Sequence, residues 1–144
     1  MSLIPTLTET ISRARADLRI GLPVVIGGYL AAAAETVSSD RVATMLALGP
    51  AVLAVTGWRA ETLKARVYDG DLARIEVPKS ADRAWLRAVA DPAGDLMTPM
   101  KGPLHSARGG DAQPHRAAIA LAKSAQLLPA VLMVQIAEAP DGLT

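Results

Sequence analysis

The side chains that could do chemistry are few, and most lie in the stretch 99–116. His115 and Arg116 fall in the first turn of a predicted helix, where free backbone N–H groups and the helix dipole favour an anion. The stretch before them adds further cations, so the predicted phosphate-binding residues are Lys101, Arg108, His115 and Arg116. The alternative is an ordinary solvated basic edge, because Gln113 and Pro114, and no glycine, stand directly before them.

The two histidines raise the question of a metal ion. His105 and His115 stand ten residues apart across a loop, with Asp111 as the carboxylate near them. This spacing is weak evidence for a metal site, because such sites group several His, Cys or carboxylate ligands. We therefore expect exposed loop histidines, no metal and no cofactor. No Ser-His-Asp order, Walker loop, GxGxxG, HExxH or CxxC motif names a reaction.

Two further residues have a functional and a structural interpretation. Glu35 ends an alanine-rich run and could be a catalytic base. Such a carboxylate more often caps a helix or pairs with an arginine, here Arg41 or Arg59, so we expect a structural role. Trp58 stands at a predicted strand-to-helix junction and could stack on a ligand, but packing against the sheet is expected.

The core must be built from small aliphatic side chains. The chain has 144 residues, 51% of them hydrophobic, with two tryptophans, two tyrosines and no phenylalanine. This length suits one domain, which we assign to residues 1–137, with 138–144 as a linker or tail. Small side chains each remove less apolar surface from water, at roughly 25 cal/mol per Å². A partner subunit would supplement that burial, so we expect an oligomer.

Composition also excludes several classes of function. Basic and acidic residues number 15 and 14 and are interspersed, which argues against nucleic-acid binding. The absence of cysteine excludes disulfides and thiolate metal sites. Proline and glycine interrupt the apolar runs 20–34 and 42–58, so we expect no membrane span. Charged residues stand where a signal peptide would be apolar, so the cytoplasm is the expected compartment.

Periodicity and turn signals predict the elements that position these side chains. Helices are predicted over 6–20, from Ser38 to Gly49, over 57–65 with Thr56 as cap, from Ser80 to a close at 91–94, and from Pro114 to about Leu127. The fourth helix has a predicted apolar face of Ala81, Ala84, Trp85 and Val89. Strands are predicted over 22–26, 29–34, 51–55, 73–77 and 130–136, and a long loop over 95–113. The strand 73–77 alternates as if half-exposed. The predicted fold class is α/β (α+β), a single-domain layered sheet with flanking helices.

Several short motifs stand in a characteristic order between Arg15 and Ile136. They are Gly21-Leu-Pro-Val-Val25, Gly28-Tyr-Leu-Ala-Ala-Ala-Ala-Glu35, Val42 to Met45, Leu53-Ala-Val-Thr56 with Arg59-Ala60, Ala81-Asp-Arg83 with Ala88 to Pro92, Pro99 to Leu104 with Gly109-Gly110, and Ala117-Ala-Ile-Ala-Leu-Ala122. In this order and spacing the chain resembles 3,4-dihydroxy-2-butanone 4-phosphate (DHBP) synthase. That family converts ribulose 5-phosphate into the four-carbon precursor of riboflavin.

The resemblance implies where the family's catalytic groups would stand, and this chain differs at each position. The acidic R-E-N-E loop would come just before Gly28, where this chain has Val25-Ile26-Gly27. The family's cysteine corresponds to Ala54, and the histidine of its P-G-H segment falls near Lys101. Glu35 is kept, at a position that we interpret as structural.

The G-H-T-E motif that opens the family's last helix also differs. An ungapped match sets Pro114 at the metal-binding histidine, His115 at the threonine and Arg116 at the glutamate. A shift of one residue would make His115 the ligand, but the glutamate would still be missing. The resemblance thus implies a degenerate domain without the ligands for a divalent cation.

The resemblance also implies partners. Such a domain precedes a GTP cyclohydrolase II domain in certain riboflavin-pathway proteins, and the family builds its sites across a homodimer. We therefore predict a dimerisation, structural or regulatory module. One alternative is binding of a phosphorylated metabolite, or residual sugar-phosphate lyase activity, through the 99–116 loop. Another is a stand-alone α/β module that shares only architecture with the synthase.

Overall fold

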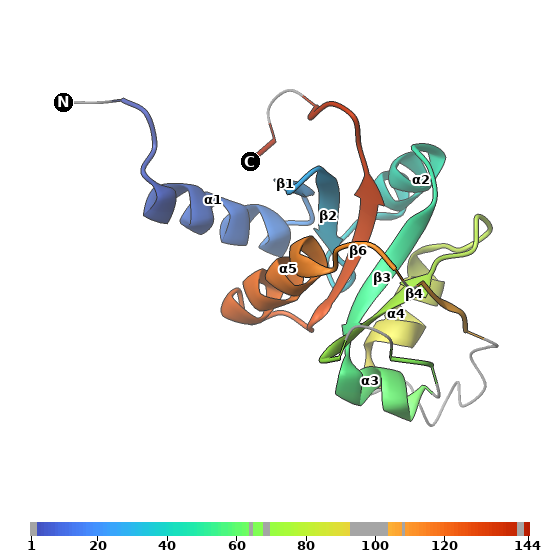
Figure 1. Ribbon diagram of the computed structural model, residues 1–144. Coiled ribbons are helices and arrows are strands. Elements are labelled where there is room, and N and C mark those ends of the chain that lie inside the picture. Colours follow the sequence, from blue (N-terminus) through green and yellow to red (C-terminus); the bar gives the residue numbers. More distant parts are fainter. Residues whose placement is uncertain (1–2, 64, 68–69, 93–103, 108, 141–142) are drawn as a thin grey trace.

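One antiparallel sheet organises the computed structural model, which describes residues 3–63, 65–67, 70–92, 104–107, 109–140 and 143–144. Its helices are α1 (Leu7–Arg19), α2 (Ser39–Ala47), α3 (Gly57–Thr62), α4 (Arg83–Ala90) and α5 (Gln113–Ser124). Its strands are β1 (Val24–Ile26), β2 (Tyr29–Ala33), β3 (Ala51–Thr56), β4 (Leu72–Glu76), β5 (Ser106–Ala107) and β6 (Ala130–Gln135). The strand order is β1-β2-β6-β3-β4-β5 (Figure 1).

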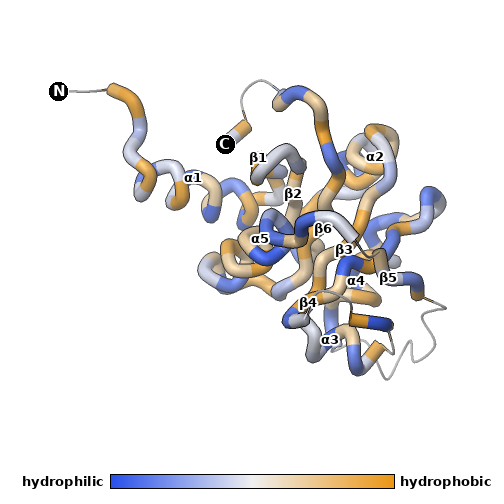
Figure 2. The backbone as a smooth tube through the Cα atoms, in the orientation of Figure 1, coloured by the Kyte–Doolittle hydropathy of each residue, from blue (hydrophilic) through white to orange (hydrophobic). Residues whose placement is uncertain are grey.

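Helices cover both faces of the sheet and make a three-layer fold (Figure 1). Because side chains alternate along a strand, β6 sends Leu132 and Val134 to one core and Val131 and Met133 to the other. Helices α2 and α4 cover the first core, with Val42, Met45, Leu86 and Val89. Helices α1 and α5 cover the second core, with Ala14, Leu18, Ala118 and Ala122. Figure 2 shows the central strands β3 and β6 as mainly hydrophobic.

Polar side chains set the starts of the helices. The Ser38 side chain accepts a hydrogen bond from the Arg41 N–H, and the Thr56 side chain accepts one from the Arg59 N–H. Each bond satisfies a backbone donor that has no partner within the helix. The predicted cap of α3 is therefore confirmed, and both helices begin where the local chemistry indicates.

The prediction of a half-exposed strand over 73–77 was wrong. The side chains of β4 from Leu72 to Ile75 are buried, Arg74 among them. The Arg74 guanidinium donates a hydrogen bond of 2.7 Å to the carbonyl of Gly109, and β5 pairs beside β4. The segment around β5 was predicted as part of a long loop, and it covers Arg74. A strand of only two residues is too short to show a periodic pattern in the sequence.

Two helices differ in detail from the prediction. In α4 the buried residues are Leu86, Val89 and Ala90, whereas Ala84 is exposed. The spacing of three and four residues puts these side chains on one face, which packs on the sheet. Helix α5 ends at Ser124 because Gln126 adopts a left-handed backbone conformation with φ of 63°.

The predicted α/β class with flanking helices is confirmed. Within the described parts of the chain, no helix has the length and apolar character needed to cross a bilayer. Thr144 returns to the body of the fold, where its hydroxyl donates a hydrogen bond of 2.7 Å to the carboxylate of Asp17 in α1.

Candidate functional site

The β1–β2 turn and the start of α5 meet in the folded chain. The turn consists of Gly27 and Gly28, both with positive φ. A Cβ atom at Gly27 would lie 3.2 Å from Cγ of Pro114, which is tighter than ordinary van der Waals contact. These are the two segments at which the resemblance sets an acidic loop and a histidine. Here a glycine and a proline ring fill the space between them.

His115 lies inside the fold. Its side chain is 1% exposed, on the same face of α5 as the buried Ala118, Ile119 and Ala122. Its ring meets that of Tyr29 edge to face, with 4.8 Å between the centroids. The expectation of an exposed histidine was therefore wrong here, because the helical period turns position 115 toward the sheet. His105, by contrast, is exposed.

Arg116 forms an ion pair with Asp71, the residue before β4. Its Nη2 donates to Asp71 Oδ1 at 2.7 Å, and its Nε lies 3.0 Å from both carboxylate oxygens. These hydrogen bonds hold the pKa of the Asp71 carboxyl below its ordinary value. The side chains of Arg116 and Asp71 are 38% and 63% exposed, so solvent screens the pair and its contribution to stability is below about 1 kcal/mol.

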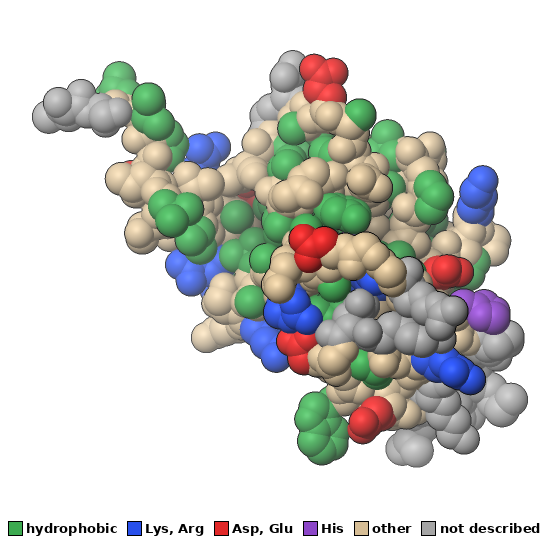
Figure 3. Space-filling model, viewed as in Figure 1, with side chains coloured by type: hydrophobic (Ala, Val, Ile, Leu, Met, Phe, Trp, Pro, Cys, Tyr) green, Lys and Arg blue, Asp and Glu red, His purple; other side chains and the backbone are tan. Residues whose placement is uncertain are grey.

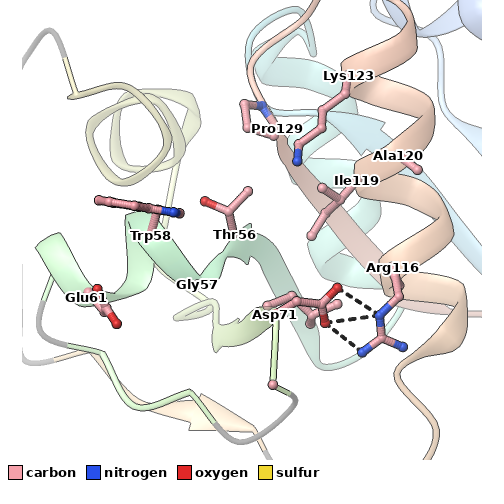
Figure 4. A pocket seen from close by; sticks show the side chains of 12 residues that line it. Thr56, Gly57, Trp58, Glu61, Asp71, Arg116, Ile119, Ala120, Lys123 and Pro129 are labelled. Atoms are coloured by element: carbon pink, nitrogen blue, oxygen red, sulfur yellow. Dashed lines mark hydrogen bonds and ion pairs between the residues drawn. The ribbon is translucent and has the colours of Figure 1, made fainter.

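An open cleft of about 820 Å³ lies between α3 and α5 (Figure 4). We call it the α3–α5 cleft. Its lining includes Thr56, Trp58, Asp71, Arg116, Ile119 and Lys123. Apolar and polar side chains thus share one surface, and with Glu61 four of the lining residues carry charge. Known small-molecule sites have volumes of roughly 300–1,000 Å³, so this cleft is large enough for a small ligand.

Trp58 projects from α3 into solvent. Its side chain is 84% exposed, so the expected packing against the sheet was wrong. The helix turns its other side inward, where Arg59 and Ala60 are buried. Sequence reasoning singled out Trp58 but could not tell which face of so short a helix would be covered.

Lys123 and Asp71 were not identified as site residues from the sequence. Lys123 follows Arg116 by seven residues, a spacing of about two turns that returns to the same helix face, and this signal was available. Asp71 gives no such signal, since it stands alone after Gly70. Two of the predicted phosphate-binding residues, Lys101 and Arg108, lie outside the described residues. Of the other two, Arg116 lines the cleft and His115 does not.

Glu35 has a backbone partner instead of an arginine. Its Oε1 accepts a hydrogen bond of 2.8 Å from the N–H of Leu128, which ties the end of β2 to the connection between α5 and β6. Arg41 donates to the carbonyl of Gly21, and Arg59 to carbonyls at the end of α4. The predicted pairing with Arg41 or Arg59 was therefore wrong, since backbone oxygens engage both guanidinium groups.

Metal-ligating residue types are not grouped in this part of the chain. Among the residues whose placement is described, no three His, Asp or Glu side chains come together. Ala54, which the resemblance sets at the family's cysteine, is fully buried in the second core.

Comparison with known proteins shows the fold. No protein-family model matches the chain, and no curated protein sequence matches it. Among solved structures, a cation-free form of 3,4-dihydroxy-2-butanone 4-phosphate synthase aligns with a TM-score of 0.62 and 19% identity, over 92% of this chain and 79% of its own. The same enzyme from Candida albicans aligns with a TM-score of 0.62 and 20% identity, over 93% and 83%.

A third solved structure is a two-domain protein. RibBX of A. baumannii, a two-domain 3,4-dihydroxy-2-butanone 4-phosphate synthase, aligns with a TM-score of 0.64 and 19% identity over 93% of this chain. The chain spans 49% of that protein's length. Together these likenesses show that the chain has a DHBP synthase-like fold.

Proposed function

We propose that this chain is a catalytically inactive domain on a DHBP synthase-like fold, which acts in the cytoplasm as a dimerisation and scaffold module of a riboflavin-biosynthesis protein. The observation that most strongly supports this proposal is the close approach of Gly27 and Pro114. Rearrangement of a sugar phosphate proceeds through an enediolate, which a divalent cation stabilises. The resemblance sets the ligands of that cation in the two segments that meet at this contact.

The residues at that contact do not fit a divalent cation. Glycine and proline side chains offer no oxygen or nitrogen ligand, and His115 is turned into the core against Tyr29. Arg116, at the position of the family's glutamate, carries a positive charge that would repel a cation. The chemistry of this donor set supports loss of the metal-dependent reaction.

Turnover measurements test the proposal. Incubated with ribulose 5-phosphate and Mg²⁺, the purified chain is expected to form no four-carbon phosphate above the protein-free blank. Mg²⁺ alone is expected to leave its melting temperature unchanged. An active DHBP synthase in the same assay is the positive control. Product that depends on Mg²⁺ and disappears with a chelator would contradict the proposal.

A homodimer is the expected form of the scaffold. Large apolar side chains are exposed on and before α1, namely Leu3, Ile4, Leu7 and Ile11, and hydrophobic side chains gather there in Figure 3. Exposed apolar clusters favour association. Light scattering after size exclusion at micromolar concentration is expected to give twice the chain mass of 15.0 kDa. A single species of one chain mass would contradict a dimer.

We also propose a fused or associated GTP cyclohydrolase II domain as partner. The solved two-domain neighbour, of which the chain spans 49%, supports a second domain in proteins with this fold. The role of the present domain would then be to hold two copies of that partner together.

A further inference from the structure

We propose that the α3–α5 cleft binds a small molecule in which a planar aromatic ring carries a phosphate group. Trp58 would stack on the ring, and Lys123 would bind the phosphate. This inference goes beyond the scaffold function and does not depend on it. It rests on the exposed indole, the lysine ammonium group beside it and the size of the cleft.

Trp58 presents an indole ring that the fold leaves uncovered. Its side chain is 84% exposed, although an indole offers more apolar surface than most side chains. The backbone beneath it is fixed from both sides. The Gly57 N–H donates to the Asp71 carbonyl at 2.9 Å, and Arg59, the next residue, is buried and bonded to carbonyls of α4. An indole has only two side-chain torsion angles, so stacking a ring on it costs little conformational entropy.

Lys123 adds a positive charge to the cleft, and after the hydrogen bonds from Arg116 this charge also helps to lower the pKa of the Asp71 carboxyl. Among the described residues its ammonium group forms no hydrogen bond or ion pair, while Asp71 is already engaged by Arg116. Figure 4 shows the Lys123 ammonium pointing into the cleft, toward Thr56 and Trp58. Glu61 also lines the cleft, but its carboxylate lies on the side of α3 away from Lys123 (Figure 4).

Three hydrogen-bond donors face one another in the cleft, beside the ion pair of Asp71 and Arg116. The ammonium of Lys123, the indole N–H of Trp58 and the hydroxyl of Thr56 come from three different elements, and the indole nitrogen is turned toward Thr56 (Figure 4). Several donors around one point suit a phosphate, which has several acceptor oxygens, better than a neutral group. Indole faces stack on planar rings such as nucleobases, at about 1–3 kcal/mol per base.

The rest of the cleft fits the body of such a ligand. Its volume of about 820 Å³ lies within the usual range for small-molecule sites. Ile119, Leu72 and Pro129 add apolar surface to the lining. Nucleoside monophosphates have the required ring and phosphate, and they serve as the probes below.

Fluorescence titration tests the site. Trp85→Phe leaves Trp58 as the one tryptophan, so that its emission reports binding directly. AMP, GMP and UMP are titrated into this variant, with adenosine and ribose 5-phosphate as probes that carry the ring or the phosphate alone. We expect saturable quenching by at least one nucleotide, with adenosine and ribose 5-phosphate each about tenfold weaker or more.

Matched variants separate the two contacts. Lys123→Ala is expected to weaken nucleotide binding about tenfold while leaving adenosine binding unchanged. Lys79→Ala, at an exposed lysine that does not line the cleft, is the control and is expected to bind as the parent does. Trp58→Leu is expected to abolish binding measured by calorimetry. An unchanged urea midpoint shows that each variant is folded.

Three outcomes would overturn the inference. The first is no saturable response to any nucleotide at about 1 mM. The second is binding that Lys123→Ala leaves unchanged. The third is a fall in mass from two chains to one in Trp58→Leu, since the indole would then be a contact between copies. Inactivity toward ribulose 5-phosphate bears on the scaffold proposal alone.

Discussion

Replacing Gly21 with alanine is expected to lower the free energy of unfolding by about 3 kcal/mol. Gly21 has φ of +87°, a left-handed conformation that costs a side-chain-bearing residue about 1–2 kcal/mol. A Cβ atom there would also lie 2.6 Å from the backbone carbonyl oxygen of Thr36, and relief of such a clash typically costs about 1–3 kcal/mol. Since the obstructing atom belongs to the backbone, it cannot rotate away. Urea unfolding with linear extrapolation measures the loss.

Gly28→Ala is the matched control. Gly28 has a similar φ of +84°, but no described atom lies within 4 Å of the position of its missing Cβ. Its replacement therefore carries only the conformational cost, about 1–2 kcal/mol. The difference between the two variants isolates the close approach of Gly21 to Thr36. Equal losses in the two variants would show that this approach does not constrain the fold.

Replacing Arg59 with alanine is the second large effect, also a loss of about 3 kcal/mol in the free energy of unfolding. The Arg59 side chain is buried and donates hydrogen bonds of 2.7 Å to the Val89 carbonyl and 3.2 Å to the Ala88 carbonyl. These oxygens lie in the last turn of α4, where carbonyls have no partner within the helix. Removing the guanidinium leaves them buried and unsatisfied, at about 1–3 kcal/mol each.

Two further variants test this account of Arg59. Arg59→Lys keeps the charge, but one ammonium cannot reproduce the planar fork of donors, so we expect about 2 kcal/mol of loss. Arg13→Ala, at an exposed position in α1, is the control and is expected to change stability by less than about 0.5 kcal/mol. Urea unfolding compares the three. A loss in Arg59→Ala as small as in the control would mean that α4 is held by its apolar face alone.

Local chemistry determined most of the elements from the sequence. Ser38 and Thr56 cap their helices because a hydroxyl before an apolar period satisfies a free backbone N–H. The glycine pair 27–28 forms the β1–β2 turn because both residues take positive φ. The apolar run 130–134 lies in a central strand because it has a core on each side. Each of these signals is complete within a few neighbouring residues.

Only the tertiary structure decided the surroundings of the functional side chains. Arg116 and Asp71 are 45 residues apart in the chain, so their pairing depends on how α5 packs beside β4. The exposure of Trp58 and the burial of His115 depend on which face of a helix meets the sheet, which composition does not specify.

The candidate site was therefore only partly predictable. Through the resemblance, the sequence by itself predicted that most cation ligands of the synthase family are missing at the matched positions, because that prediction uses residue identities alone. It also pointed to Arg116 and Trp58 as separate candidates. Only the folded structure shows that both residues line one cleft with Lys123. The cleft forms between elements that are far apart in the sequence, and no local sequence pattern predicts that they pack together.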